Sequence, residues 1–230
     1  MCNLIKAEFF RIRHTDRCLL ILVGISLLGV FLSFVPNSTT DSQGAQIGIF
    51  CCIIAVGAVI SSHFQSRTAF YEMMDGKSPH AIILSRIVLY TPIIILCYFV
   101  PVSAIRLLLD GSVENVKFLA LLLVILVRLL IFTICIVLIF RNMEGIVMVF
   151  PRIIIGMMPL LLHNEGLIDL FENSSVLGWF PLCQCVYMSS QIDSVLIMKV
   201  VMGFVVEVVF MYSLAYMSYK RKWLIQTKMA

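Results

Sequence analysis

The chain has 230 residues, of which 61% are hydrophobic and only 13% are charged, and its mean hydropathy is +1.03. Soluble globular domains contain about 45–50% apolar and about 25% charged residues, so a soluble enzyme, a disordered chain and a small secreted disulfide protein are excluded. Each helical crossing of a bilayer takes about 20 residues, which leaves little of this length for a folded domain outside the membrane. The composition predicts an all-α, polytopic membrane protein that forms a single domain over residues 1–230.

Residues 1–17 precede the first long apolar run. Ile5, Phe9 and Ile12 recur at helical spacing, and basic residues flank them. This pattern predicts a short amphipathic helix in the inner interface of the membrane, with its cations near anionic headgroups. A plain juxtamembrane anchor is an equal alternative.

Six apolar stretches have about the length of a membrane span. Five are continuous, and the fifth in chain order is broken by Pro151, Arg152, Gly156 and Pro159. None of them alternates apolar and polar residues, as the strands of a membrane barrel do. The predicted spans are 18–35, 45–62, 87–105, 118–140, 145–162 and 195–219.

The positions of Lys and Arg predict the orientation of these spans, because cytoplasmic loops carry an excess of basic residues. With both termini in the cytoplasm, twelve basic residues lie inside and only Arg106 and Lys117 lie outside. This arrangement requires an even number of spans, so we count the broken stretch as one. The net charge of +4 then follows from topology and requires no nucleic-acid partner. The inner basic residues are Lys6, Arg11, Arg13, Arg17, Arg67, Lys77, Arg86, Arg141, Lys220, Arg221, Lys222 and Lys228.

The longest cytoplasmic connection is the loop of residues 63–86. Phe70, Met73 and Met74 make one apolar face, Gly76 suits the C-terminal end of a helix, and a proline follows three residues later. The spacing predicts a helix of two to three turns that lies parallel to the membrane. Its Met and Phe side chains either dock another protein or rest on lipid.

Nothing in the sequence indicates a catalytic, metal or cofactor site on this chain. Gly76-Lys77-Ser78 looks like the end of a phosphate-binding loop, but that motif needs glycine at the position of Tyr71. No Cys/His cluster has the spacing of a zinc site. The serines in the spans have no intramembrane histidine partner for nucleophilic catalysis. We therefore predict that the chain is not an enzyme by itself.

Four charged residues lie inside the predicted spans, and one of them, Lys199, is only about a turn inside the outer end and can snorkel to the interface. Counted from the outer ends at 1.5 Å per residue, Arg128 and Glu207 are both about 15–18 Å deep. Equal depth and opposite sign favour an ion pair between them, for which Arg152 is a competing partner of Glu207. A charge at mid-bilayer costs roughly 2.5–3.5 kcal/mol on the insertion scale. The other three residues therefore either line a substrate path or fix the register of the helices.

Residues 163–194 form the longest outer segment. Their apolar pieces are too short to cross the membrane and are interrupted by Gly178 and Pro181. They predict re-entrant turns or an interfacial cap, and irregular backbone at that depth is tolerated only against protein or a water-filled cavity. The segment is therefore either an outer gate or a simple cap.

This order of elements resembles the membrane subunit of ABC-2 type ABC transporters, particularly small bacterial permeases that export bacteriocins or lantibiotics or confer immunity to them. Such permeases have an amphipathic N-terminal helix, six spans, a coupling helix between spans two and three, and a broken fifth span followed by short outer re-entrant helices. The loop also carries Glu72, three residues and then Gly76, similar to the family's E-x-x-x-G-T motif, with Lys77 in place of threonine. Ser85 and Arg86 match the S-R pair that follows in the family.

The resemblance implies a permease subunit in the bacterial cytoplasmic membrane that moves an amphipathic substrate such as a peptide, an antibiotic or a lipid-like molecule. ATP and Mg would bind to a separate ATPase subunit, and a second permease, identical or related, would complete the path in the lipid bilayer. The alternative is a stand-alone membrane immunity or binding protein that works without ATP. The residues implied to couple the chain to the ATPase are Arg67, Phe70, Glu72, Met73 and Gly76.

Overall fold

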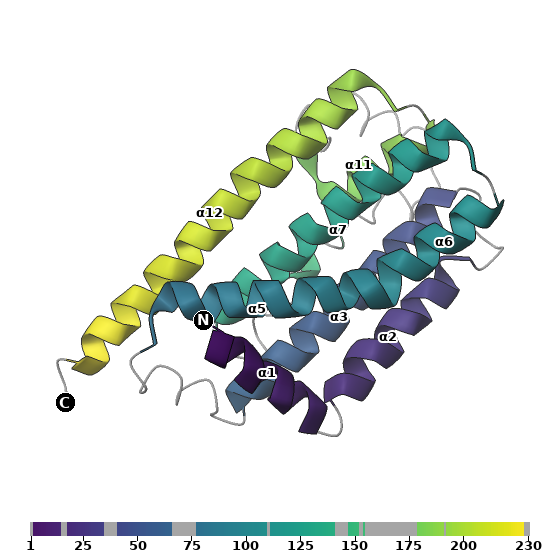
Figure 1. Cartoon of the computed structure of the whole chain (residues 1–230). Coiled ribbons are helices and arrows are strands. Elements are labelled where there is room, and N and C mark those ends of the chain that lie inside the picture. The colour runs from purple at the N-terminus through teal and green to yellow at the C-terminus, as the bar shows by residue number, and fades with distance from the viewer. Residues whose placement is uncertain are drawn as a thin grey trace.

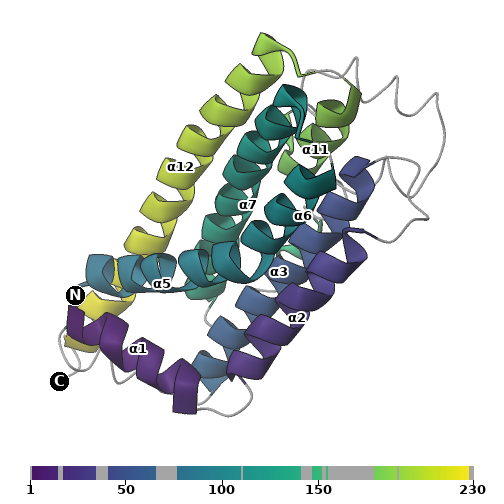
Figure 2. The same cartoon turned by 45° about the vertical axis from the view of Figure 1, so that its right-hand side comes forward.

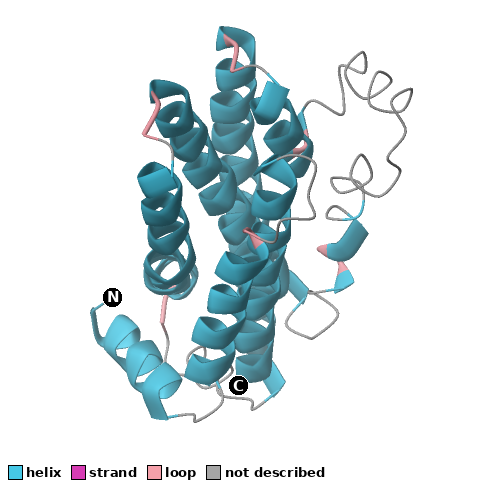
Figure 3. Ribbon diagram, turned by 90° about the vertical axis from the view of Figure 1, so that its right-hand side faces the viewer, coloured by secondary structure: helices cyan, strands magenta, loops and turns pink. Residues whose placement is uncertain are grey.

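The computed structural model describes residues 2–14, 18–34, 41–65, 77–109, 111–140, 147–151, 154, 179–190 and 192–227 (Figure 1). Over these ranges the main elements are all helices and none is a strand, which confirms the predicted fold class for the described part of the chain (Figure 3). The elements are α1 (Cys2–His14), α2 (Cys18–Leu32), α3 (Asp41–Gln65), α5 (Pro79–Ile94), the π-helix η1 (Ile95–Phe99), α6 (Val100–Leu109), α7 (Val113–Phe140), α11 (Pro181–Ser190) and α12 (Ser194–Thr227).

Among the described residues, four helical stretches are long and apolar enough to cross a membrane, so the chain is a helical membrane protein. Another predicted span, 18–35, contains α2, an apolar helix of 15 residues. At 1.5 Å per residue α2 is about 22 Å long, shorter than a hydrocarbon core of about 30 Å. Most of the predicted broken span 145–162 lies outside the described residues. The four stretches are Gly44–Ser62, Pro79–Leu109, Val113–Phe140 and Ser194–Arg221.

Helices α3 and α7 form the centre of the bundle. The buried share of the apolar stretch is 78% in α3 and 67% in α7, whereas it is 22% in both the α5–α6 stretch and α12. Helix α2 packs along α3, and α12 packs along α7 (Figures 1 and 2). Both termini lie at the same end of the bundle, where α1 also lies (Figure 2).

The helix that contains the third predicted span begins earlier than the sequence indicated, so both ends of the predicted loop of residues 63–86 are helical. Helix α3 continues to Gln65, and α5 already begins at Pro79. The Ser78 hydroxyl accepts a hydrogen bond from the backbone N–H of Ala81 at 3.3 Å. Proline suits the first position of a helix because its missing N–H is not needed there. Pro79 therefore starts the next helix as well as preventing continuation of the preceding one.

The same span is interrupted by the π-helix η1, which carries Tyr98 into the bundle. The Tyr98 hydroxyl donates to the Ala45 carbonyl of α3 at 3.2 Å and lies 3.2 Å from the Ser33 hydroxyl at the end of α2. Gly48 leaves the space for this ring, because a Cβ there would lie 2.6 Å from the Tyr98 Cε2 atom. The π-helix thus joins α2 and α3 by buried hydrogen bonds that an unbroken α-helix would not place there.

Helix α1 confirms the predicted N-terminal helix but turns a different face to the protein. Leu4, Glu8 and Ile12, spaced four apart, are all buried, and α1 packs against α5. Phe9, which was predicted on the same stripe as Ile12, is instead 53% exposed. The reason is an ion pair, because Glu8 Oε1 lies 2.9 Å from Arg86 Nη2 with both side chains at most 1% exposed. The face of α1 that carries Phe9 is left exposed.

Candidate functional site

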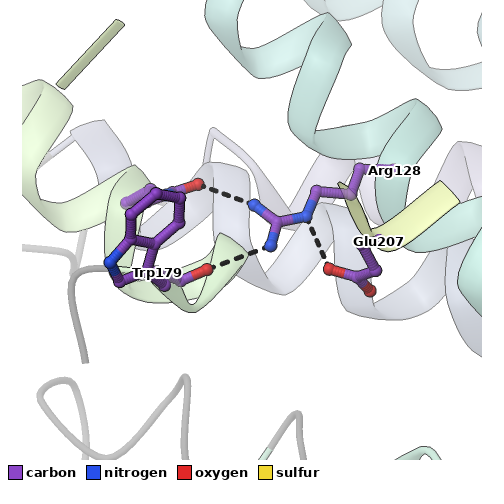
Figure 4. A network of polar contacts seen from close by, with 4 residues as sticks. Arg128, Trp179 and Glu207 are labelled. Carbon is purple, nitrogen blue, oxygen red and sulfur yellow. Dashed lines mark hydrogen bonds and ion pairs between the residues drawn. The ribbon is translucent and has the colours of Figure 1, made fainter. Parts of the chain in front are cut away.

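The two charges predicted to pair within the spans do so. Arg128 lies near the middle of α7, and its Nε donates to Glu207 Oε2 of α12 at 2.7 Å (Figure 4). The side chains are 5% and 12% exposed, respectively. The predicted pair is confirmed, whereas its role in a substrate path stays a prediction. Arg152, the predicted competitor, lies outside the described residues.

Arg128 also binds the segment that carries α11. Its Nη1 donates to Gln184 Oε1 at 3.2 Å, and its Nη2 donates to the backbone carbonyl of Trp179 at 3.1 Å (Figure 4). All three guanidinium nitrogens therefore have an acceptor, and the acceptors come from two different helices and a turn. We call Arg128, Glu207, Gln184 and the Trp179 carbonyl the Arg128 cluster.

The Arg128 cluster ties three elements together at one point. A buried ion pair is stable only when further hydrogen bonds satisfy its polar atoms, and Gln184, with no exposed surface, supplies one of them. Because the guanidinium is engaged on every nitrogen, it fixes α7, α11 and α12 relative to one another. The geometry therefore supports the register-fixing role and adds the short helix α11 to it.

The cluster lies well inside the length of the spans. The guanidinium packs against Gly203, nine residues after the start of α12 at Ser194, which is about 14 Å along the helix at 1.5 Å per residue. The Trp179 carbonyl is at the same level because it contacts the same guanidinium. Helix α11 accordingly contacts α3, α7 and α12, and only part of the predicted segment 163–194, residues 179–190 and 192–194, is described.

A hydrogen bond from α3 also holds the start of α11. Gln46 Nε2 donates to the backbone carbonyl of Leu182 at 2.6 Å, and Gln46 has no exposed surface. Sequence reasoning missed both Gln46 and Gln184, because an amide in an apolar span has no charge to draw attention. Each is a polar residue within an apolar helix, and this is the only sequence feature that indicates a buried hydrogen bond there.

Gly203 makes room for the cluster. A Cβ at this position would lie 2.6 Å from Arg128 Nη1 and 2.9 Å from its Cζ, closer than real contacts allow. Gly203 precedes Glu207 by four residues, so the two share one face of α12. In the sequence, the signal for this contact is a glycine one turn before an intramembrane acid.

We expect Gly203→Ala to lower the free energy of unfolding by about 1–3 kcal/mol, because the new methyl group pushes the guanidinium off its acceptors. The matched control is Gly24→Ala in α2, where nothing lies within 4 Å of the added Cβ. There alanine should be neutral or stabilising by up to about 1 kcal/mol, since it is the better helix former. Unfolding of both variants in bicelles gives the comparison, and equal effects would contradict the packing.

Another buried ion pair lies near the end of the bundle that carries the termini. Besides Glu8, the Arg86 guanidinium faces the ring of Phe64 at 5.6 Å from its centroid. Nearby on α5, His80 Nδ1 lies 2.8 Å from the Tyr212 hydroxyl of α12. The first turns of α5 are thus attached to α1, α3 and α12. Arg86, which the family resemblance singled out only as part of a motif, has a structural partner that the sequence did not reveal.

The predicted coupling residues cannot be placed in the same way. Residues 66–76 lie outside the described part of the chain. Within the described ranges, no three His, Cys, Asp or Glu side chains come together as a metal site would need. The coupling residues outside those ranges are Arg67, Phe70, Glu72, Met73 and Gly76.

Comparison with known proteins gives no relative from which a function can be transferred. No protein family, no curated protein and no solved structure matches the chain. The function must therefore be inferred from the geometry of the Arg128 cluster, the order of the helices and the loop motif.

Proposed function

We propose that this chain is the permease subunit of an ATP-driven ABC transporter and that it moves an amphipathic substrate, such as a peptide, an antibiotic or a lipid-like molecule. One observation carries the proposal: a charged cluster holds a short helix, α11, between the spans. Charged residues inside membrane helices are rare, and substrate or ion pathways are one of the functions that they mark. Interrupted helices near the midplane form the binding sites of many transporters.

The proposed topology has six spans with both termini in the cytoplasm of a bacterial cell. Helix α7 ends at the end of the bundle where the termini lie, and α12 begins at the opposite end (Figures 1 and 2). The connection between them thus makes a net crossing, which supports counting the stretch 145–162 as the fifth span. In this proposal α2 is the first span, and α11 belongs to a re-entrant outer segment.

The energy source in this proposal is a separate ATPase subunit that binds ATP and Mg and docks on the loop between α3 and α5. That loop leaves and re-enters the bundle at the end that carries the termini, as α3 ends at Gln65 and α5 starts at Pro79. Through Arg86 and His80 the first turns of α5 contact α1 and α12, so a movement of the loop reaches both. A second permease, identical or related, completes the path.

The test is photo-crosslinking in the native cells, followed by purification of the tagged chain in mild detergent. A photoreactive amino acid replaces Met73 in the loop, and the control replaces Glu114, an exposed residue at the start of α7. We expect a crosslink to an ATPase subunit from position 73 only, together with vanadate-sensitive ATP hydrolysis in the purified sample. Absence of both the crosslink and the hydrolysis would contradict the proposal and favour the stand-alone immunity or binding protein.

A further inference from the structure

The start of α11 is held through its main chain. Gln46 of α3 donates to the Leu182 carbonyl at 2.6 Å, and Arg128 of α7 donates to the Trp179 carbonyl at 3.1 Å. Both donors belong to the surrounding spans, and both acceptors are backbone atoms of one four-residue stretch. Donors of this kind bind any peptide that presents carbonyls at this spacing, whatever its side chains.

The same place has an acceptor that α11 does not use. Gln46 Oε1 is buried and has no hydrogen-bond partner among the described residues. A buried amide oxygen without a donor is unfavourable, and a backbone N–H placed there would satisfy it. Two donors and one acceptor, all close to the stretch 179–182, are the complement of a peptide backbone. We call Gln46 and Arg128, with the space filled by residues 179–182, the α11 seat.

The segment in the seat is apolar. It reads Trp-Phe-Pro-Leu, and Pro181 and Leu182 are buried. Helix α11, which begins in this stretch, contacts α3, α7 and α12, and the buried core of the described residues is formed mainly by aliphatic side chains. An occupant of the seat therefore combines apolar side chains with backbone carbonyl and N–H groups.

We propose that the α11 seat is a binding site for apolar peptide segments and that residues 179–182 occupy it as a built-in competitor. A peptide in the seat accepts from Gln46 and Arg128 through its carbonyls and donates an N–H to Gln46 Oε1. The inference rests on the proposed function, for which it supplies a substrate class and a site. Its test does not involve the ATPase.

A substitution of Gln184 distinguishes the effect of the competitor from the effect of the seat. Its side chain accepts from Arg128 Nη1, whereas the backbone carbonyls of Trp179 and Leu182 accept from Arg128 Nη2 and Gln46 Nε2. Gln184→Ala should therefore loosen α11 and make the seat more accessible. Gln46→Leu removes a donor that α11 and a bound peptide share, and it also removes the acceptor Oε1, which only the peptide uses. The proposal thus predicts opposite effects of two amide substitutions on peptide binding.

The experiment measures the affinity of the full chain in lipid nanodiscs for a fluorescent peptide, acetyl-Trp-Phe-Pro-Leu-amide, with empty nanodiscs subtracted. We expect Gln184→Ala to bind the peptide about three- to tenfold more tightly than the unmodified chain, and Gln46→Leu to bind it more weakly by a similar factor, as for one hydrogen bond. Ser213→Ala, on an exposed face of α12, is the matched control and should not change the affinity. The polar peptide acetyl-Ser-Gln-Pro-Ser-amide should show no response to either variant.

The proposal is overturned if Gln184→Ala binds the peptide no more tightly than the unmodified chain. It is also overturned if this variant gains affinity for an apolar lipid, lysophosphatidylcholine, but not for the peptide. If Gln46→Leu does not fold, the Gln184→Ala result still decides. Because no ATPase is present, a failure here leaves the permease proposal standing. Conversely, tight and variant-sensitive peptide binding by a chain that recruits no ATPase would support the seat and overturn only the transporter.

Discussion

Neutralising Arg128 or Glu207 alone should destabilise the chain strongly, and the two single losses in the free energy of unfolding should add up to more than the loss in the double variant. Glu207→Gln and Arg128→Gln are each expected to lower the free energy of unfolding by about 3–5 kcal/mol, because each leaves a buried charge without its counter-charge. Arg128→Gln should be the more damaging of the two, since it also removes the hydrogen bonds to Gln184 and Trp179.

The double variant provides the decisive comparison. We expect it to lose about 1–3 kcal/mol less than the sum of the two single losses, as measured by steric trapping or denaturant unfolding in bicelles. Ser213→Ala on the same helix controls for general effects of altering α12. A double variant whose loss equals the sum of the single losses would show that the two side chains do not depend on each other.

Substituting Arg86 should release α1 from the bundle. Glu8 is 1% exposed and lies 2.9 Å from the guanidinium, so Arg86→Gln leaves the carboxylate buried without that cation. The expected loss is again about 3–5 kcal/mol, with the largest increase in hydrogen exchange in residues 2–14. Exchange in α7 serves as the internal reference.

Two further variants separate the ion pair from a general disturbance of α1. Glu8→Gln combined with Arg86→Gln should recover part of the protection of α1, because the buried carboxylate that lost Arg86 is then replaced by a neutral amide. Lys6→Gln, at an exposed position of the same helix, should leave exchange unchanged. Unchanged exchange of α1 in the Arg86→Gln variant would contradict the role assigned to the pair.

Hydrophobicity and charge were enough to predict the helices and the central ion pair. An apolar run of span length needs no tertiary information, so four of the predicted spans correspond to observed apolar helices. Arg128 and Glu207 were paired from depth and sign alone, because an ion buried in a membrane has few alternatives to a partner of opposite sign. In each of these cases a single energetic term dominates.

Features that depend on which way a helix turns were predicted less well. The stripe of Ile5, Phe9 and Ile12 was expected to face the membrane interface together, yet Ile12 is buried and Phe9 is exposed. Apolar side chains suit both lipid and protein, so hydrophobicity alone cannot distinguish the two faces. The position of Glu8 was the better guide, since a carboxylate among apolar residues needs a cation.

The hydrogen bonds from Gln46 and Arg128 to the start of α11 could not be predicted, because their acceptors are backbone carbonyls. The carbonyls of Trp179 and Leu182 have no signature in the sequence, and the amide of Gln46 is recognisable as a clamp only once α11 is in place. The start of α5 at Pro79 shows a similar limit, because a proline fits both the end of one helix and the first turn of the next.

In the proposed topology α11 enters the membrane and is held there at the level of the Arg128 cluster. The chain has two tryptophans, so Trp223→Phe leaves Trp179, whose side chain is 42% exposed, as the only one. Its fluorescence is measured in vesicles of lipids brominated at defined depths along the acyl chain. We expect the strongest quenching from deep bromines, with a shift toward shallow bromines in the Arg128→Gln variant. Strongest quenching by shallow bromines or by aqueous iodide in the unmodified cluster would contradict the claim.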